Sequence, residues 1–397
     1  MSMRFLDQID IKGKRLLIRV DYNVPVKNGA VQDDTRIKGS LETIRYCLDK
    51  GASLVLCSHL GKAKGKPDPA FSLQPAAQRL SELIGCKVQM APDCIGPEVE
   101  KMARSLKPGE ILLLENLRFH EGETKNDQQF SAALAKMGEI FVNDAFGTAH
   151  RAHASMVGVP KHIPQCCAGF LLKKEWEYIG ENLGDPKRPY VAISGGAKVS
   201  SKLAVLHRLL SQVDALIIGG AMANTFLLAQ GHSVGKSLVE PDLLDEAKKI
   251  MNEAKKRGVE LHLPADVVLG HGLDDKQSMG TVDVGSIPDD AMVLDIGPKT
   301  REQYAKAVSK ARTVMWNGPM GAFENSAFAD GSLAMARAVA GLPDTLTVVG
   351  GGDTDALVHK TGLADKFSFI STGGGSFMEF LEGKELPAFA ALQECGR

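Results

Sequence analysis

Two lysines four residues apart follow a glycine pair near the middle of the chain. Within Ser194–Lys202, Gly195 and Gly196 follow an apolar run typical of a buried strand, and Lys198 and Lys202 precede an apolar pattern of helical spacing. Glycines let backbone N–H groups approach a ligand closely, and a helix N-terminus favours negative charge. Two lysines on one helical face repel each other unless an anion lies between them, so the stretch predicts a phosphate-binding turn. The alternative is a tight turn with two solvated lysines.

Polar side chains, most of them basic, follow the apolar runs in the first half of the chain. The residues with this placement are Asp21, Asn23, Arg36, His59, Lys62, Arg118 and Arg151. Basic side chains from separate strand ends suit a small molecule with several negative charges, and Asp21 and Asn23 can bond to hydroxyl groups. The alternative is that the arginines form ordinary surface ion pairs. We favour a binding site, because five basic residues converge from separate segments.

Glycine-rich turns follow successive apolar runs in the second half. They lie at 195–196, 219–224, 316–324, 350–354 and 372–376. Several helix N-termini directed at one place predict a site for nucleotide phosphates. Asp353, at the expected start of a helix, is placed to hold a magnesium ion against those phosphates, or it could instead cap the helix.

Three other sequence features bear on a P-loop, a nicotinamide dehydrogenase and a metal site, and none of them favours that function. Residues 231–237 resemble a phosphate-binding P-loop, but they have three residues where the motif needs four, and they follow a helix. No Gly-x-Gly-x-x-Gly follows a strand, which argues against a nicotinamide dehydrogenase. His150 and His153 suggest a metal, but polar-bonded histidines near a phosphate are the preferred interpretation.

The elements that must position these residues alternate between strand and helix. Apolar runs of strand length lie at 16–20, 53–57, 111–114, 140–142, 191–193, 215–218, 292–296, 313–316, 346–349 and 367–370, and helical patterns lie at 73–83, 130–137, 243–256 and 333–339. Such alternation predicts an α/β protein with parallel sheets covered by helices on both faces. Ligands of these sheets bind beyond the carboxyl ends of the strands, where the polar residues above are found.

Composition and length narrow the class of protein further. The chain has 397 residues, of which 44% are hydrophobic and 24% are charged, so a globular protein of two or three domains is expected. The polar run 181–189 is the candidate boundary. A net charge of −1 gives no reason to expect binding to nucleic acid or to an anionic membrane.

The cysteines and the N-terminal residues indicate the cellular compartment of the protein. The seven cysteines are an odd number without Cys-x-x-Cys spacing, and several lie in apolar runs, so we expect reduced thiols, neither a disulfide framework nor a zinc site. Residues 1–7 lack an apolar signal core, and no apolar run is long enough to span a bilayer. A cytoplasmic location is therefore expected.

Several segments together resemble one enzyme family. They are 19–25, 58–61, 115–119, 143–153, 194–202, 316–324 and the glycine triplets 350–352 and 373–375. Their sequences and order, from about residue 15 to about residue 387, closely resemble phosphoglycerate kinase. The resemblance implies two Rossmann-like three-layer (αβα) domains joined by a hinge. It also implies reversible phosphoryl transfer from 1,3-bisphosphoglycerate to ADP in glycolysis, giving 3-phosphoglycerate and ATP, with Mg²⁺ as cofactor and a monomeric enzyme.

The resemblance also assigns roles to matching residues. For 3-phosphoglycerate it implies contacts with Asp21, Tyr22, Asn23, Arg36, His59, Leu60, Gly61, Lys62, Arg118 and Arg151. For the nucleotide it implies Lys202, Glu324, which would contact the ribose, Gly350, Gly351, Gly352, Asp353 and Thr354, with Asp353 holding the metal. Arg36, Lys198 and Gly374 would be catalytic, and Arg36 and Lys198 would steady the phosphoryl group during transfer.

Domain ranges follow from the same resemblance. We expect a 3-phosphoglycerate-binding domain at 1–172, an interdomain helix and linker at 173–188, a nucleotide-binding domain at 189–380, and a segment at 381–397 that returns to the first domain. One position departs from the family pattern, since Lys62-Ala63 stands where Arg-Pro is usual. Lysine keeps the charge but loses the bidentate geometry of arginine, which puts the strength of that contact in question.

The reaction itself explains why no general base is conspicuous. A carboxylate acceptor is already ionised at neutral pH, so catalysis must come from positioning and charge, and the two half-sites must close to exclude water. Two other functions are weighed against this one. They are a kinase for a different phosphorylated acid and a non-catalytic two-domain binding protein.

Overall fold

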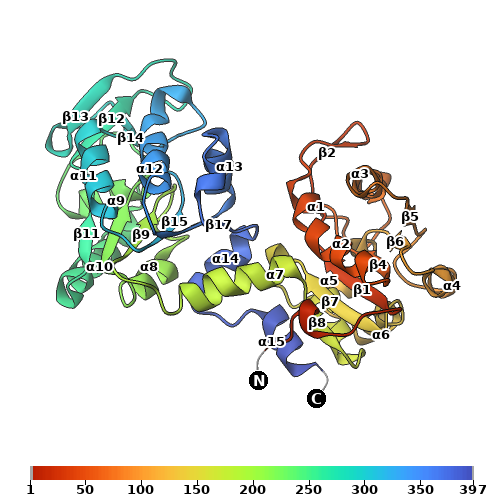
Figure 1. Cartoon of the computed structure of the whole chain (residues 1–397). Helices are drawn as coiled ribbons and strands as arrows, with labels where there is room; N and C mark the ends of the chain where they lie inside the picture. The colour runs from red at the N-terminus through yellow and green to blue at the C-terminus, as the bar shows by residue number, and fades with distance from the viewer. Residues whose placement is uncertain (1–2, 396–397) are drawn as a thin grey trace. The chain divides into compact units, whose positions relative to one another are not determined.

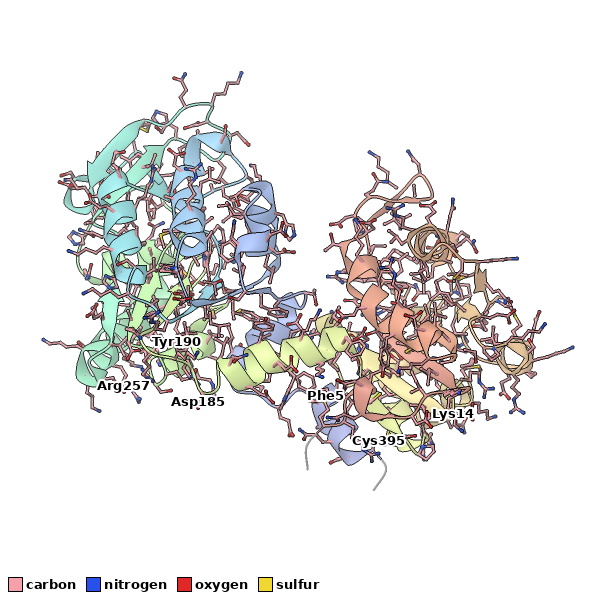
Figure 2. All side chains as sticks on the ribbon, viewed as in Figure 1. Phe5, Lys14, Asp185, Tyr190, Arg257 and Cys395 are labelled. Atoms are coloured by element: carbon pink, nitrogen blue, oxygen red, sulfur yellow. A yellow bond between two sulfur atoms is a disulfide. The ribbon has the colours of Figure 1, made fainter. Side chains whose placement is uncertain are left out.

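In the computed structural model, residues 3–395 are described and form two compact units (Figure 1). The N-terminal unit comprises residues 3–177 together with 385–395, and the C-terminal unit comprises 178–384. The first division lies within the segment 173–188 that was predicted as a linker, and the second follows Lys384. Positions 1, 2, 396 and 397 of the predicted ranges lie outside the described residues. In Figure 2, Phe5, Lys14 and Cys395 mark the N-terminal unit, and Asp185, Tyr190 and Arg257 mark the C-terminal unit.

The N-terminal unit is built on a six-stranded parallel sheet. Its strand order is β5 (Val88–Met90), β6 (Ile111–Leu113), β4 (Ser53–Cys57), β1 (Arg15–Val20), β7 (Ile140–Asp144) and β8 (Cys166–Ala168). Central β1 pairs with β4 and β7, so Leu17 lies between Val55 and Phe141. A two-stranded hairpin, β2 (Val26–Lys27) and β3 (Ala30–Val31), lies outside this sheet.

Helices cover both faces of the N-terminal sheet. They are α1 (Thr35–Gly39), α2 (Leu41–Asp49), α3 (Gln74–Ile84), α4 (Pro97–Ser105), α5 (Glu121–Lys125), α6 (Gln128–Ala135), α7 (Phe170–Glu175) and α15 (Pro387–Glu394). Leu16 and Ile18 of β1 share one hydrophobic cluster with Ile44 of α2 and Leu80 of α3. Leu17 points to the opposite face and is equally buried, as expected for a strand covered on both sides.

The C-terminal unit repeats this design with an added small sheet. Its parallel sheet has the order β11 (Glu260–His262), β10 (Ala215–Ile218), β9 (Tyr190–Ser194), β15 (Thr313–Asn317), β16 (Leu346–Gly350) and β17 (Phe369–Ile370). The second sheet is antiparallel, with the order β13 (Gly280–Asp283), β12 (Asp266–Gly270) and β14 (Met292–Ile296). The predicted α/β class is thus confirmed, but the run 292–296 belongs to this antiparallel sheet and to neither parallel one.

Along the chain, helices of the C-terminal unit alternate with its strands. They are α8 (Leu203–Leu209), α9 (Met222–Ala229), α10 (Leu244–Arg257), α11 (Pro298–Val308), α12 (Asp330–Ala340), α13 (Gly352–Lys360) and α14 (Gly374–Leu381). Short 3-10 or π-helical segments occupy Leu6–Gln8, Pro69–Phe71, Leu117–Phe119, Phe146–Thr148, Ala154–Gly158, Val159–Lys161, Trp176–Asn182, Pro241–Leu243, Val284–Ser286, Ser326–Phe328 and Ala364–Lys366. Among residues 3–395, no helix is both long and apolar enough to cross a membrane.

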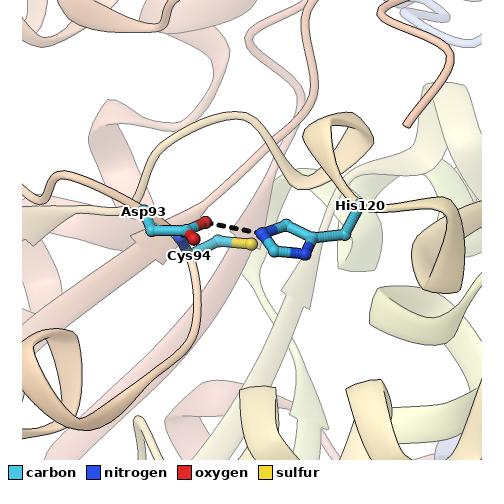
Figure 3. A group of neighbouring side chains, drawn as sticks. All are labelled: Asp93, Cys94 and His120. Atoms are coloured by element: carbon cyan, nitrogen blue, oxygen red, sulfur yellow. Dashed lines mark hydrogen bonds and ion pairs between the residues drawn. The ribbon is translucent and has the colours of Figure 1, made fainter. Parts of the chain in front are cut away.

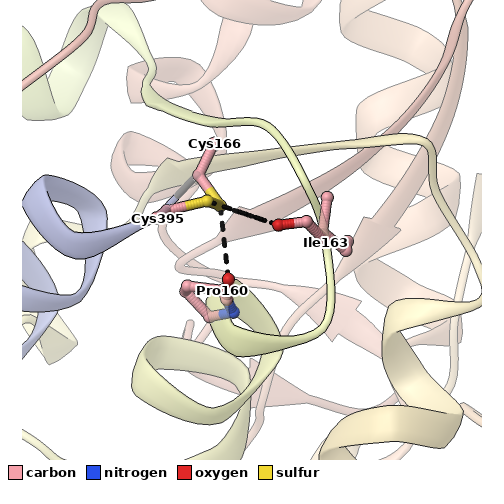
Figure 4. The surroundings of a disulfide bond; sticks show 4 residues. All are labelled: Pro160, Ile163, Cys166 and Cys395. Atoms are coloured by element: carbon pink, nitrogen blue, oxygen red, sulfur yellow. Dashed lines mark hydrogen bonds between the residues drawn. A yellow bond between two sulfur atoms is a disulfide. The ribbon is translucent and has the colours of Figure 1, made fainter. Parts of the chain in front are cut away.

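One expectation about the cysteines is wrong. Cys166 of β8 and Cys395, the residue after α15, form a disulfide (Figure 4). The other five cysteines are free: Cys47, Cys57, Cys94 and Cys167 are buried and Cys86 is exposed. The odd number and the spacing could not reveal this bond, because its partners are 229 residues apart in the sequence.

Candidate active site

The carboxyl ends of β1, β4 and β7 bring several predicted anion-binding residues together in the N-terminal unit. Asp21 follows β1, and its carboxylate accepts a hydrogen bond of 2.8 Å from Arg36 Nη1 in α1. His59, the second residue after the end of β4, has Nδ1 4.0 Å from the other oxygen of Asp21. Because adjacent parallel strands end at the same edge, residues far apart in sequence meet at this place.

The segment after β6 adds a second arginine. Arg118 Nη1 donates to the carbonyl oxygen of Gly61 at 2.5 Å, and the backbone N–H of Gly61 donates to Asn23 Oδ1 at 2.9 Å. Arg118 Nε is buried without a hydrogen-bond partner, so this guanidinium keeps an unused donor. An unpaired buried donor costs free energy, which an anionic ligand would recover.

The pKa values of His59 and Arg118 reflect their burial and the positive charges around them. Burial lowers the pKa of His59 well below its usual value, and Arg19, Arg118, Arg151 and Arg36 lower it further. Burial also lowers the pKa of Arg118 to about 10, with repulsion from Arg151 and Arg19 adding to the effect. The arginines therefore share one region of positive potential, in which His59 is neutral and the guanidinium groups remain charged at neutral pH.

Three further predicted contact residues differ in how exposed their side chains are. The Tyr22 side chain is fully buried and its hydroxyl lies 2.9 Å from Ser40 Oγ, so only its backbone could reach a ligand. Leu60 is also buried. Lys62 is exposed and lines a hollow with Lys64, Arg118 and Lys125.

In the C-terminal unit, Lys202 lies at the junction of two glycine-rich turns. Its Nζ donates to the carbonyl oxygens of Gly195 at 2.6 Å and Asn317 at 2.8 Å. Gly220, with φ of +67°, packs so closely against Gly196 that a Cβ would collide with the Gly196 backbone. Burial lowers the pKa of Lys202 to about 7, and Asp353 opposes this shift.

Lys198 and Lys202 do not share a helical face, so this part of the sequence prediction is wrong. Helix α8 begins at Leu203, and both lysines precede it in an irregular turn. Glu240 holds this turn, because its carboxylate accepts hydrogen bonds from the N–H and the hydroxyl of Ser200. Lys198 is exposed, whereas Lys202 points back into the unit.

The turn after β16 joins the same region. Thr354 Oγ1 accepts a hydrogen bond of 2.7 Å from the N–H of Gly318, and Asn317 Nδ2 donates to Gly350 O at 2.7 Å. Gly351 has φ of +96°, a conformation that favours glycine. Helix α13 begins at Gly352, so Asp353 is its second residue and Gly351 occupies the N-cap.

A second helix begins beside α13. A Cβ placed on Gly374, the first residue of α14, would lie 3.8 Å from the backbone nitrogen of Gly352. The N-termini of α13 and α14 therefore approach each other, and both favour negative charge. The geometry brings Gly350–Thr354, Gly374 and Lys202 into one region of the C-terminal unit.

A mostly apolar cavity opens beside these turns. Its lining includes Gly196, Gly220, Leu238, Val293, Glu324 and Asp353. Apolar walls with a carboxylate at the edge suit a nucleoside, since the base needs an apolar surface and the ribose hydroxyls need acceptors. Asp353 is exposed at this cavity, and its carboxylate is a ligand type that Mg²⁺ prefers.

A model of the family described as "Phosphoglycerate kinase" matches residues 6–384. The chain belongs to the phosphoglycerate kinase family. It is therefore a phosphotransferase with a carboxyl group as acceptor, as the motifs predicted.

Individual members of the family are similar over the whole chain. Phosphoglycerate kinase of Maridesulfovibrio salexigens is 57% identical over 396 residues, which cover 99% of this chain and 100% of that protein. The Moorella thermoacetica enzyme is 53% identical, with 99% of this chain and 100% of that protein covered. The solved phosphoglycerate kinase of Coxiella burnetii has a TM-score of 0.92 at 40% identity and covers 100% of both chains. That of Pyrococcus horikoshii has a TM-score of 0.85 at 34% identity and covers 98% of both chains.

Sequence reasoning missed two residues that shape the N-terminal site of this phosphoglycerate kinase family member. Arg19 is almost fully buried within β1, donates to Ser155 Oγ at 3.0 Å, and lies 3.0 Å from His59 Nδ1. Asn116 donates to the carbonyl oxygens of Leu60 and Phe71 and accepts from the N–H of Arg118. An arginine inside an apolar strand was the available signal for Arg19, whereas nothing local distinguishes Asn116.

Three residues of metal-binding types from two separate stretches of the sequence come together in the N-terminal unit. Asp93, Cys94 and His120 offer ligand atoms within 4.8 Å of one another, and Asp93 Oδ1 lies 2.7 Å from His120 Nε2 (Figure 3). Burial, together with the negative charges of Asp93 and Glu123, raises the pKa of the Cys94 thiol well above its usual value. A metal ion would have to displace that proton, so the geometry is explained by the Asp93–His120 pair alone.

Proposed function

We propose that the chain catalyses the reversible transfer of a phosphoryl group from 1,3-bisphosphoglycerate to ADP, giving 3-phosphoglycerate and ATP. The observation that carries this proposal is a cluster of basic groups around His59: Arg19 lies 3.0 Å from its Nδ1, Arg36 is bonded to the neighbouring Asp21, and Arg118 and Arg151 are close enough to lower its pKa. An anion bound among these guanidinium groups would offset their mutual repulsion, and a phosphorylated carboxylic acid supplies two anionic groups.

We propose that Asp21, Asn23, Arg36, His59, Arg118 and Arg151 bind the phosphoglycerate, with backbone contributions from Tyr22, Leu60 and Gly61. The unused donor of Arg118 and its 2.5 Å bond to Gly61 support a guanidinium that is already oriented for an anion. Lys62 lies at the exposed side and adds charge without the bidentate geometry of arginine.

For the nucleotide, we propose that Lys202 and the backbone of Gly350–Thr354 bind the phosphates and that Glu324 contacts the ribose. The meeting of α13 and α14 supports this assignment, since two helix N-termini favour negative charge at one place. Asp353 would hold Mg²⁺, which neutralises charge on the phosphate oxygens when it is bound.

The chemistry requires no general base in this arrangement. The acceptor carboxylate is ionised at neutral pH, so the residues act by position and charge. We propose that Arg36 and Lys198 stabilise the charge that develops on the transferred phosphoryl group and that the N–H of Gly374 contributes to the same oxyanions. Lys198 is exposed in an irregular turn, a position from which its ammonium group could reach a ligand.

A coupled assay tests the function directly. We expect ATP consumption that depends on 3-phosphoglycerate, ATP and Mg²⁺ together, and ATP formation from 1,3-bisphosphoglycerate and ADP. Turnover with a different phosphorylated acid and none with 3-phosphoglycerate would favour the related kinase. Ligand binding without turnover would favour a non-catalytic binding protein. An Arg118→Ala variant should raise the KM for 3-phosphoglycerate and leave that for ATP unchanged.

The likeness to phosphoglycerate kinases further supports a monomer that acts in the cytoplasm. Light scattering during size-exclusion chromatography should give the mass of one chain. A mass of two chains or more would reject the monomer.

A further inference from the structure

The C-terminal helix α15 packs against the turn that carries Arg151. The N–H of Ala388 donates to the carbonyl oxygen of Ala149 at 3.1 Å, and the ring of Phe389 lies 6.1 Å from the ring of Phe146. Phe389 also meets Trp176 edge-on, with ring centroids 5.1 Å apart. Since Ala149 lies two residues before Arg151, α15 supports the backbone of this turn.

The other end of α15 is held by the disulfide. Cys395 directly follows the helix, and Cys166 belongs to β8, the edge strand of the N-terminal sheet (Figure 4). One end of α15 therefore contacts the turn before Arg151, and the opposite end is covalently attached to the sheet. A helix of only two turns depends on such tertiary contacts, because short helices are marginal in isolation.

The two cysteines differ in their exposure to solvent. Cys166 is 3% exposed, whereas Cys395 is partly exposed and lines a surface hollow with Pro160, Ile163 and Glu394. Because Cys395 lines this hollow and Cys166 does not, we expect a thiolate that enters it to attack Cys395. The bond is therefore open to attack from one side.

The surroundings also suit the reduced pair. The carbonyl oxygens of Pro160 and Ile163 lie 3.8 Å and 3.9 Å from Cys166 Sγ, and the Ile163 oxygen lies 3.5 Å from Cys395 Sγ (Figure 4). These oxygens can accept hydrogen bonds from the S–H groups that reduction would create. The folded N-terminal unit can therefore accommodate both the disulfide and the two thiols.

We propose that Cys166–Cys395 is a reversible redox site, opened by a dithiol reductant, and that its reduction loosens α15 and weakens anion binding at Arg151. The consequence for anion binding rests on the function proposed above. The covalent change is confined to the two cysteines, and its mechanical effect passes through Ala388 and Phe389.

The exchange is balanced by the reductant. One thiolate of the dithiol attacks Cys395 Sγ, which forms a mixed disulfide and releases the Cys166 thiolate. The second thiolate of the dithiol then attacks the sulfur that the dithiol contributed to the mixed disulfide. This closes the dithiol's own disulfide and releases the Cys395 thiolate. Two electrons and two protons pass from the dithiol to the cysteines, and the dithiol leaves as a disulfide. A disulfide oxidant reverses both steps.

Thiol counts and hydrogen exchange test the redox site. The full chain is treated either with dithiothreitol or with its oxidised cyclic form, and thiols are then counted in denaturant. We expect seven thiols in the first sample and five in the second. In the reduced sample, amides of residues 387–395 and 146–151 should exchange faster. Seven thiols in both samples, or equal exchange in these segments, would overturn the proposal.

Ligand binding and variants complete the test. Reduction should raise the Kd for 3-phosphoglycerate roughly threefold or more, with the Kd for ADP unchanged. Cys395→Ser should behave as the reduced protein in both conditions, whereas Cys86→Ser, which removes an exposed free thiol, should respond as the parent chain does. An equal Kd in both redox states would overturn the link to Arg151. If neither form binds 3-phosphoglycerate, the proposed function fails, and the exchange data still decide whether the disulfide controls α15.

Discussion

The guanidinium of Arg36 lies 2.8 Å from the carboxylate of Asp21, at the carboxyl end of the central strand β1. Asp21 is largely buried, whereas Arg36 is partly exposed, so the carboxylate orients an arginine whose other donors remain accessible. This pair gives the N-terminal site one charged donor in a defined position. It also makes the orientation of Arg36 depend on the charge of Asp21.

Removing that charge should weaken phosphoglycerate binding. In an Asp21→Asn variant, Arg36 loses a charge-assisted hydrogen bond worth about 1.5–3 kcal/mol, so the KM for 3-phosphoglycerate should rise roughly tenfold or more. The KM for ATP should not change, because Asp21 belongs to the N-terminal unit. Steady-state kinetics with each substrate varied in turn would check this, and an equal rise in both KM values would contradict it.

Lys198 should matter for turnover more than for nucleotide binding. Lys198 lies in an irregular, exposed turn. From there its ammonium group can stabilise the charge on the phosphoryl group during transfer. Lys198→Ala should lower kcat by about a hundredfold or more, with a much smaller change in the KM for ATP. Lys236→Ala, an exposed lysine of the same unit, serves as the control and should leave both parameters unchanged. An unchanged kcat for Lys198→Ala would remove its assigned role.

Nucleotide binding should depend on the protonation of Lys202. Burial places its pKa at about 7, so the group is charged below that pH and becomes neutral above it. Nucleotide phosphates favour the ammonium form, so ADP affinity should fall as the pH rises above 7, and binding near this pH should take up protons. Calorimetry in buffers of different ionisation enthalpy measures that uptake. Lys202→Arg, which stays charged, should abolish it, and uptake that persists in this variant would point to another group.

His153 should contribute to the pH dependence of stability. Burial and the nearby Arg118 and Arg151 lower its pKa to about 4 from 6.5. Between these values the unfolded chain binds more protons than the folded one, so this contribution is complete above pH 6.5 and is lost as the pH falls towards 4. After allowance for solvent screening, the loss should be on the order of 1 kcal/mol. Thermal midpoints from pH 7 to pH 5 should fall less in His153→Asn than in a variant of the exposed His162.

Lysine at position 62, where arginine is usual in the family, should have only a small effect on the affinity for 3-phosphoglycerate. Its side chain is exposed and lines a hollow with Lys64, Arg118 and Lys125, so it provides charge with little fixed geometry. Lys62→Arg should leave the affinity for 3-phosphoglycerate unchanged or raise it slightly. A large loss of affinity, measured by titration calorimetry, would show that the position has a more specific role.

The sequence by itself determined the alternation of elements and the polar residues that follow them. Apolar runs predict strands whatever lies next to them, and strand ends in parallel sheets meet at one edge, so Asp21, His59 and Arg118 could be grouped without coordinates. The glycine turns around Gly195 and Gly350 could be recognised in the same way. These are local signals, since each depends on a few consecutive residues.

The tertiary structure alone decided the features that depend on distant neighbours. Burial of Arg19, the carbonyl oxygens that enclose Lys202, and the hydrogen bonds of Asn116 arise from segments far away in the sequence. The pairing of Cys166 with Cys395 likewise depends on how the end of α15 packs beside β8, which the expected return of the C-terminal segment did not specify. Burial and partner distance are properties of the folded chain, because they depend on which segments pack together, and residue type and spacing alone do not contain them.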